Sequence, residues 1–221
     1  MKKNFIYILL AILSMSFFKP GPRKVIFFGD SITEMGVKPG GYIMQMQQML
    51  EQNGKAAQYK LIGAGIGGNK IYDLYLRHET DVLAKKPDMV VIYVGVNDVW
   101  HKVTHQTGTD KDKFEKFYRA LIAKFKLAGI QVILATPAGI GEKKSNGNPQ
   151  DADLNAYSDI IRKIAADTSC KLVDLRALWQ NHQEVNNLNN EAKGVLTTDG
   201  VHLNETGNKA VAMAMLKALE Q

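Results

Sequence analysis

The chain has 221 residues, 45% of them hydrophobic and 23% charged, and a formal net charge of +6. This length fits one domain with a full hydrophobic core, and the composition is typical of soluble globular proteins and excludes intrinsic disorder. The basic residues are scattered, which excludes the clustered positive charge of a nucleic-acid-binding surface. Cys170 is the only cysteine, so an internal disulfide and a cysteine-based metal site are excluded.

The N-terminus has the layout of a secretory signal. Lys2 and Lys3 precede an apolar stretch that starts at Phe5, and Pro20 and Pro22 end it. The stretch is short for a membrane-spanning helix. We therefore predict that residues 1–22 are a signal peptide or an uncleaved signal anchor, and that the folded domain occupies residues 23–221. The protein is then exported to the periplasm or the extracellular space, with membrane contact only through an uncleaved N-terminal segment.

From residue 24 onward, short apolar runs alternate with longer helical patterns. The predicted strands are Val25–Phe28, Tyr59–Ala64, Met89–Val94, Gln131–Ala135 and Lys171–Val173. The predicted helices are Tyr42–Gln52, Ile71–Ala84, Lys113–Ala128, Leu154–Asp167 and Glu205–Leu219, the last with Asn204 as its N-cap. Continuous apolar strands separated by helices predict an α/β fold, a three-layer α/β/α domain with a five-stranded parallel sheet. We expect the polar stretches 137–150 and 181–196 to be loops on the ligand-binding rim.

A serine, a histidine and an aspartate occupy positions suited to nucleophilic catalysis. Ser31 directly follows the first predicted strand, and ligands of open α/β sheets bind at such strand ends. A serine needs a base to take its proton and a third group to orient that base. Asp199 lies three positions before His202, so its carboxylate can reach one ring nitrogen and leave the other for Ser31. The alternative is that Ser31 only caps the following helix, a role we also expect for Asp30.

Two further strand ends supply hydrogen-bond donors for an oxyanion. Gly65 follows the second predicted strand, and its amide is accessible because no Cβ intervenes. Asn97 follows the third strand and offers its side-chain amide, while Ser31 offers its own N–H. Attack by a serine on an ester creates an oxyanion that requires such donors. The predicted oxyanion hole therefore consists of Ser31, Gly65 and Asn97.

These segments resemble the four sequence blocks of the SGNH hydrolase superfamily, also called GDSL lipases or esterases. The blocks are Gly29-Asp30-Ser31-Ile32-Thr33, Gly65, Gly95-Val96-Asn97-Asp98 and Asp199-Gly200-Val201-His202. The resemblance extends from about residue 24 to the end of the chain. It implies a flavodoxin-like fold and ester hydrolysis, with Ser31 as nucleophile, His202 as base and Asp199 as its orienter, and without cofactor or metal. Ile32 and Gly63 depart from the pattern, since the family often has Leu and Asn there.

Two other motifs indicate different classes of protein. Gly63, Gly65 and Gly68 match the G-x-G-x-x-G fingerprint of dinucleotide binding. The fingerprint also requires an acidic residue about twenty positions later at a strand end, whereas Asp81 lies in a helical pattern. His101 and His105 have the spacing of a metal-binding pair, but no third ligand accompanies them and their segment is predicted to be a loop.

The expected substrate follows from the character of the rim. Its loops are polar, at 143–146 and 186–190, and no long apolar lid lies between the strands. This favours short acyl groups on a polar alcohol, such as an O-acetylated carbohydrate or another small ester. Two alternatives stay open: a lysophospholipase or thioesterase for longer acyl chains, and a non-catalytic carbohydrate-binding protein on the same fold. Trp100 and Tyr42 are expected beside the rim, where aromatic side chains line substrate clefts.

Overall fold

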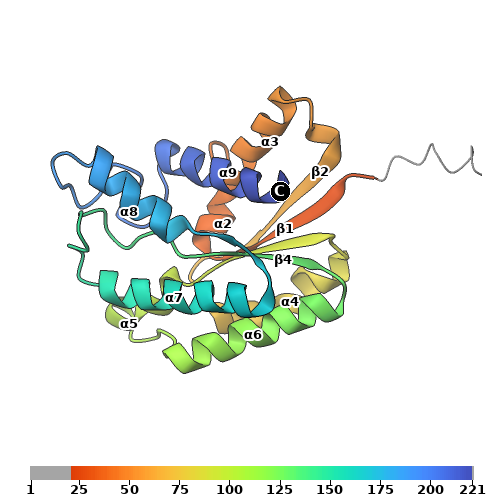
Figure 1. Cartoon of the computed structure of the whole chain (residues 1–221), viewed down its shortest axis with the longest axis horizontal. Coiled ribbons are helices and arrows are strands. Elements are labelled where there is room, and N and C mark those ends of the chain that lie inside the picture. Colours follow the sequence, from red (N-terminus) through yellow and green to blue (C-terminus); the bar gives the residue numbers. More distant parts are fainter. Residues whose placement is uncertain (1–20, 221) are drawn as a thin grey trace, which may run out of the picture.

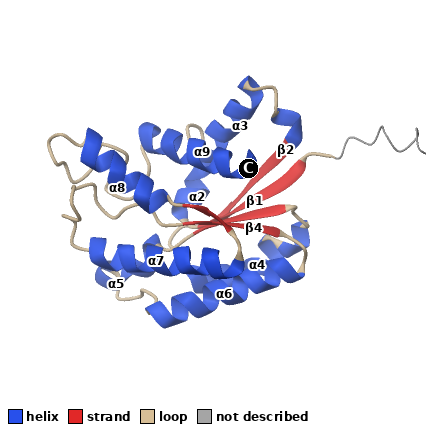
Figure 2. Cartoon of the chain, in the orientation of Figure 1, coloured by secondary structure: helices blue, strands red, loops and turns tan. Residues whose placement is uncertain are grey.

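The computed structural model describes residues 21–220, so the predicted N-terminal signal, apart from Gly21 and Pro22, lies outside the described residues. Its centre is a five-stranded sheet in the order β2-β1-β3-β4-β5, in which all neighbours are parallel (Figures 1 and 2). The strands are β1 (Arg23–Gly29), β2 (Tyr59–Gly65), β3 (Met89–Tyr93), β4 (Gln131–Ala135) and β5 (Lys171–Val173). This order is that of flavodoxin-like folds, and the predicted fold class is confirmed.

Helices cover both faces of the sheet (Figure 2). The α-helices are α2 (Ser31–Gly36), α3 (Tyr42–Gln52), α4 (Ile71–Asp81), α5 (Val96–Thr104), α6 (Lys111–Leu127), α7 (Asp151–Thr168), α8 (Leu175–Asn186) and α9 (Glu205–Glu220). Two short 3₁₀ helices, η2 (Ala56–Gln58) and η3 (Leu83–Lys85), precede β2 and β3. The helix predicted over 71–84 therefore ends at Asp81. Asn204 caps α9 as predicted, since its side-chain oxygen accepts a hydrogen bond from the Gly207 amide at 3.0 Å.

The strands bury side chains on both faces, which explains why their sequences are continuously apolar. In β1, Val25 and Phe27 join the core beneath α2, α3, α8 and α9. Ile26 and Phe28 join the opposite core, beneath α4, α6 and α7 (Figure 1). All four side chains have no exposed area. An alternating pattern would have left one face of the sheet in water, and that arrangement is excluded here.

Two segments predicted to be loops are helical. The loop expected over 181–196 begins only after Asn186, because α8 continues through its first six residues. Helix α8 buries Leu175, Trp179 and Gln183 at intervals of four residues, a helical repeat in which one member is polar. The loop expected around His101 is part of α5, which buries Val96 and Val99. Both helices have a short buried face that includes polar residues, so the apolar pattern that predicts a helix is broken in the sequence.

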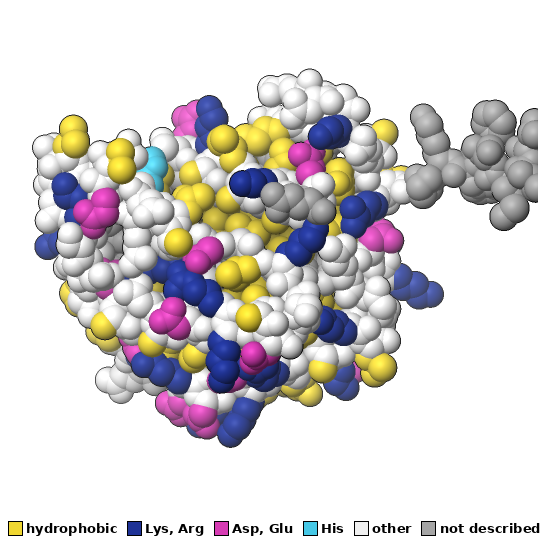
Figure 3. All heavy atoms as spheres, viewed as in Figure 1, with side chains coloured by type: hydrophobic (Ala, Val, Ile, Leu, Met, Phe, Trp, Pro, Cys, Tyr) yellow, Lys and Arg dark blue, Asp and Glu magenta, His cyan; other side chains and the backbone are white. Residues whose placement is uncertain are grey.

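The face seen in Figure 1 carries exposed hydrophobic side chains near its middle (Figure 3). A groove of about 840 Å³ lies between β5, α8 and α9, where Val185 and Met213 are 71% and 57% exposed. Neither Ser31 nor His202 lines this groove, so it is separate from the site described below. Within residues 21–220, none of the helices combines the length and the apolar character that crossing a bilayer requires.

Candidate active site

Ser31 is the first residue of α2, at the carboxyl end of β1. Asp30 caps this helix: its Oδ1 accepts a hydrogen bond from the Ile32 amide at 3.0 Å, as expected for a cap residue. Asp30 is only 2% exposed. Burial raises the pKa of its carboxyl to about 7, although the hydrogen bond from Ile32 acts in the opposite direction. Ser31, the candidate nucleophile, therefore directly follows a buried residue whose side chain is hydrogen-bonded to the start of α2.

Asp199 and His202 belong to one short turn before α9. Asp199 Oδ1 accepts hydrogen bonds from the amides of Val201 at 2.9 Å and His202 at 2.8 Å, and Oδ2 lies 2.7 Å from His202 Nδ1. Partial burial alone would raise the pKa of Asp199, but these hydrogen bonds outweigh it and hold the pKa below its ordinary value. The carboxylate therefore fixes both the backbone of the turn and the orientation of the imidazole ring.

The fold brings the three predicted residues together across the sheet. Ser31 Oγ lies 3.0 Å from His202 Nε2, although 171 positions separate them. With the Nδ1 proton directed to Asp199, Nε2 is free to accept the hydroxyl proton of Ser31. A serine, an imidazole and a carboxylate in this sequence of contacts can generate a nucleophile at neutral pH.

Asn97 lies at the same rim, at the start of α5. It is 2% exposed, and its Nδ2 donates to the Asn69 carbonyl at 3.1 Å. That bond uses one of two amide hydrogens and orients the other. The neighbouring Asp98 holds the start of α4 by accepting from the Ile71 amide, and burial raises the pKa of its carboxyl to about 7. Asn97 is therefore held between α5 and the loop that follows β2.

Gly65 has a packing role that its position in the sequence does not reveal. A Cβ on Gly65 would lie 2.1 Å from the Glu34 amide nitrogen and 2.6 Å from the Asp30 carbonyl oxygen, so only glycine allows α2 to approach β2 this closely. The next amide, that of Ile66, donates to the Gly29 carbonyl. Because successive peptide groups of a strand point to opposite sides, the Gly65 N–H points away from β1.

Two further glycines, Gly67 and Gly68, follow β2. A Cβ on Gly67 would be 3.9 Å from Ser31 Cβ. Gly68 has φ +76°, a left-handed conformation that favours glycine, and it precedes Asn69, whose carbonyl accepts from Asn97. Gly68 was not predicted as a site residue, and the only signal for it in the sequence was the glycine-rich run itself. Gly68 therefore directly precedes the residue whose carbonyl orients the Asn97 side chain.

The two aromatic residues expected at the rim have different positions. Trp100, on α5, is half-buried and meets the His202 ring edge-on, with centroids 6.3 Å apart. Tyr42 does not line the site: it is fully buried, and its hydroxyl lies 3.1 Å from Thr33 Oγ1. Its place at the first turn of α3 directs the ring onto β1, where it packs against Phe27. The expectation for Tyr42 was therefore wrong.

The glycine-rich fingerprint and the His101–His105 pair have surroundings in the structure that differ from those of a dinucleotide site and a metal site. In the glycine-rich loop, the Gly67 amide donates to the Glu34 carboxylate at 2.7 Å, so an acidic group occupies a donor that a dinucleotide phosphate would need. The rings of His101 and His105 contact each other at a tilt of 50°, with centroids 4.3 Å apart. Over residues 21–220, no three His, Cys, Asp or Glu side chains are grouped so that they could hold a metal ion.

Comparison with known proteins identifies the family of the chain. Residues 27–210 match the model of the GDSL-like Lipase/Acylhydrolase family. An acetylxylan esterase of Geobacillus stearothermophilus is 31% identical over 215 residues, which cover 89% of this chain and 94% of that protein. The crystal structure of an acetyl xylan esterase, AlAXEase, has a TM-score of 0.88 at 60% identity and covers 89% of this chain and 99% of its own. That of Axe2, from Geobacillus stearothermophilus, has a TM-score of 0.78 at 28% identity, covering 92% and 97%.

The family model spans most of the chain, and the four sequence blocks that resemble those of SGNH hydrolases all lie within the matched region. The chain belongs to the GDSL-like lipase/acylhydrolase family of the SGNH superfamily and is a hydrolase of ester bonds.

Proposed function

We propose that the protein removes acetyl groups from acetylated carbohydrates of the xylan type through a covalent acetyl-enzyme. The observation that carries the proposal is the chain of contacts from Ser31 through His202 to Asp199. Relatives with 60% and 31% identity that cover most of this chain are acetylxylan esterases. Two solved relatives are catalytic mutants of Axe2, one with a serine and one with an aspartate replaced by alanine, which are the residue types of Ser31 and Asp199.

The reaction proceeds in two stages. His202 Nε2 takes the proton of Ser31 Oγ as the oxygen attacks the acetyl carbonyl, and Asp199 stabilises the imidazolium. The sugar hydroxyl then leaves with the proton from His202, and Ser31 carries the acetyl group. Water, deprotonated by the same imidazole, attacks the acetyl-enzyme, and the collapse of the second tetrahedral intermediate returns the proton to Ser31 and releases acetate.

We propose three donors for the oxyanion: the Ser31 amide, the Asn97 side chain and the Gly68 amide. The Ser31 amide is the first of α2, and such amides have no partner within the helix. Gly68 replaces Gly65 in the original prediction, because Gly65 is packed against α2 and Gly68 lies beside the carbonyl that orients Asn97. Replacing Asn97 by alanine is expected to lower kcat about 10²–10³-fold.

The test compares acyl-chain length and a nucleophile variant. Wild-type protein is expected to hydrolyse 4-nitrophenyl acetate faster than the butyrate and octanoate esters, and to release acetate from acetylated xylooligosaccharides. Ser31→Ala is expected to abolish both activities and labelling by a fluorophosphonate probe. Activity that persists in Ser31→Ala would exclude the nucleophile. Highest activity on octanoate would exclude the acetyl preference and favour the long-chain alternative.

We further propose that the enzyme is exported. The charged and apolar pattern before Pro20 supports this proposal, as does a polymeric substrate that a cell meets outside its membrane. The measurement is the mass of the protein purified from culture medium or periplasm after expression of the full chain. A mature form that lacks the N-terminal segment is expected, and a protein that retains Met1 and stays inside the cell would contradict export by cleavage.

A further inference from the structure

Glu142 lies buried beneath the segment that leads to Asp199 and His202. Its side chain has no exposed area. One carboxylate oxygen accepts from the Val195 amide at 2.7 Å, and the other from the Leu196 amide at 2.7 Å and the Thr197 hydroxyl at 2.8 Å. All three partners donate, an arrangement that suits an ionised carboxylate. Three consecutive residues of the histidine-bearing segment are therefore tied to one side chain.

Thr197 extends this connection to the turn itself. Its Oγ1 donates to Glu142 and accepts from the Gly200 amide at 2.9 Å. The Gly200 carbonyl in turn accepts from the Gly141 amide at 2.8 Å, so the residue before Glu142 also holds the turn. A continuous path of hydrogen bonds thus runs from Glu142 to Gly200, between Asp199 and His202.

The Asp199–His202 pair needs such an anchor because its own bonds are local. The hydrogen bonds to the Asp199 carboxylate come from Val201 and His202, all within the turn. These bonds orient the imidazole within the turn but leave open where the turn lies relative to Ser31. That placement depends on what fixes residues 195–200 to the rest of the molecule. A displacement of about 1 Å at a catalytic contact costs on the order of a hundredfold in rate.

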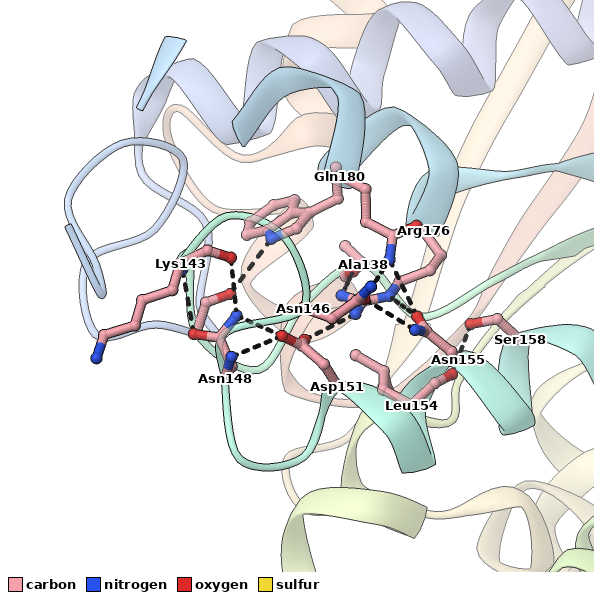
Figure 4. A network of polar contacts seen from close by, with 12 residues as sticks. Ala138, Lys143, Asn146, Asn148, Asp151, Leu154, Asn155, Ser158, Arg176 and Gln180 are labelled. Carbon is pink, nitrogen blue, oxygen red and sulfur yellow. Dashed lines mark hydrogen bonds and ion pairs between the residues drawn. The ribbon is translucent and has the colours of Figure 1, made fainter. Parts of the chain in front are cut away.

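The loop that bears Glu142 is itself firmly held. Figure 4 shows the Arg176 side chain reaching Ala138, near the start of this loop, and Asp151, directly after its end. The Arg176 guanidinium, 2% exposed, donates to the Ala138 carbonyl at 3.1 Å and to Asp151 at 2.7 Å. On the far side of Glu142, the Lys143 amide donates to Asn148 Oδ1 at 3.1 Å. Glu142 therefore stands between two fixed points of the β4–α7 connection.

We propose that Glu142 is a positioning residue of the esterase reaction, acting through Thr197 to hold His202 at hydrogen-bonding distance from Ser31. It contacts neither substrate nor reacting atoms. The two oxygens of its carboxylate together accept three hydrogen bonds. A glutamine could not replace it, because only the amide oxygen accepts and the amide nitrogen donates. This inference rests on the proposed roles of Ser31, His202 and Asp199.

The test is Glu142→Gln, with Glu184→Gln as its matched control. Glu184 is an exposed carboxylate that accepts from the Ser145 amide at 2.6 Å, so its replacement perturbs the same loop but not the histidine turn. Glu142→Gln is expected to lower kcat for 4-nitrophenyl acetate about 10–100-fold, as loss of a supporting hydrogen bond does elsewhere, with KM changed less than about twofold. Labelling of Ser31 by a fluorophosphonate should slow by the same factor. Glu184→Gln should match wild type.

A spectroscopic measurement separates misplacement of the turn from general loss of structure. The Nδ1 proton of His202, hydrogen-bonded to Asp199, is expected to give a resonance in the downfield region of the proton NMR spectrum. Since that bond lies within the turn, the resonance should persist in Glu142→Gln while the labelling of Ser31 slows. Full activity in Glu142→Gln, or an equal loss in Glu184→Gln, would overturn the proposal. So would loss of the resonance together with the activity, because the residue would then only maintain the fold.

Thr197 provides an independent pair of variants if Glu142→Gln does not fold. Thr197→Ser keeps the hydroxyl and should retain activity, whereas Thr197→Val keeps the shape and should lose it about tenfold or more. Equal activities of the two would overturn the relay. His202→Ala separates failure of the Glu142 proposal from failure of the proposed function. If it is inactive while Glu142 and Thr197 variants are unaffected, only this inference fails; if His202→Ala is fully active, the proposed function fails.

Discussion

The two sides of the site are built in opposite ways. Ser31 stands at a strand–helix junction where the neighbouring Asp30 is 2% exposed and Gly65 allows direct backbone contact between β2 and α2. His202 and Asp199 lie in a loop, where their side chains are 23% and 49% exposed. The proposed nucleophile is thus placed by the sheet, and the proposed base is placed by hydrogen bonds. We therefore expect variants of the residues that support Ser31, such as Asp30 and Gly65, to change stability, and variants of the proposed base to change rate with little change in stability.

The largest expected effect is on the base side. His202→Ala should lower kcat/KM by about 10⁴-fold or more, because the unassisted hydroxyl of Ser31 is a poor nucleophile. The ring bonds only Ser31 and Asp199 among the described side chains, so Tm should stay within about 2 °C of wild type. Enzyme assays and differential scanning calorimetry check both. A large fall in Tm would show that the two sides are not separable in this way.

The next effect is on the nucleophile side and depends on pH. The pKa of Asp30 is raised by burial to about 7 from 3.8, so below pH 3.8 its contribution to stability is fully present. As pH rises toward 7, the unfolded state loses the proton first and the free energy of unfolding falls, by about 4 kcal/mol at most. Asp30→Asn keeps the cap and removes this titration. Urea unfolding at pH 4 to 8 should show that the free energy of unfolding of the variant increases relative to that of wild type as pH rises.

Asp199→Asn is the matched comparison for that measurement. The pKa of Asp199 is lowered, so its contribution is present above pH 3.8 and is lost only as pH falls below that value. The variant should therefore differ in pH dependence from wild type only on the acid side. Parallel curves for wild type and Asp30→Asn between pH 4 and 7 would contradict the burial of a protonated Asp30.

The smallest effect concerns the glycine at the end of β2. Gly65→Ala should lower the free energy of unfolding by about 1–3 kcal/mol, since its Cβ would lie 2.1 Å from the Glu34 amide nitrogen. Thermal unfolding of Gly65→Ala and of wild type is the measurement. A Tm equal to that of wild type would contradict the packing role of Gly65.

The sheet could be predicted from the sequence because strands that are buried on both faces consist of continuous apolar residues. The sequence predicted the neighbourhood of Ser31, Asp199 and His202 because each lies at a strand end or beside a helix start. It could not separate the close packing of Gly65 from the left-handed conformation of Gly68, because both residues are glycines of one glycine-rich run. Nor could the sequence predict the role of Glu142. Two of its partners are backbone amides more than fifty positions away, and a backbone amide is present whatever the residue type.

Helix α8 was missed for a related reason. Its buried face includes Arg176 and Gln183, polar residues that a hydrophobic periodicity counts as exposed. Arg176 is buried because Asp151 and Ala138 satisfy it, and these partners come from α7 and from the end of β4. Such compensation exists only once the chain has folded.

The hydrogen bonds of the Asp199 carboxylate all lie within the turn that also carries His202. The proposed base and its orienter therefore form one local unit, and the tertiary distance that has to be kept is the one from His202 to Ser31. We expect that rim loops can change in length and sequence without a change in the chemistry, as long as the sheet and the hydrogen bonds from residues 195–197 to Glu142 remain. Exchange of these loops is then expected to change which alcohol the enzyme accepts.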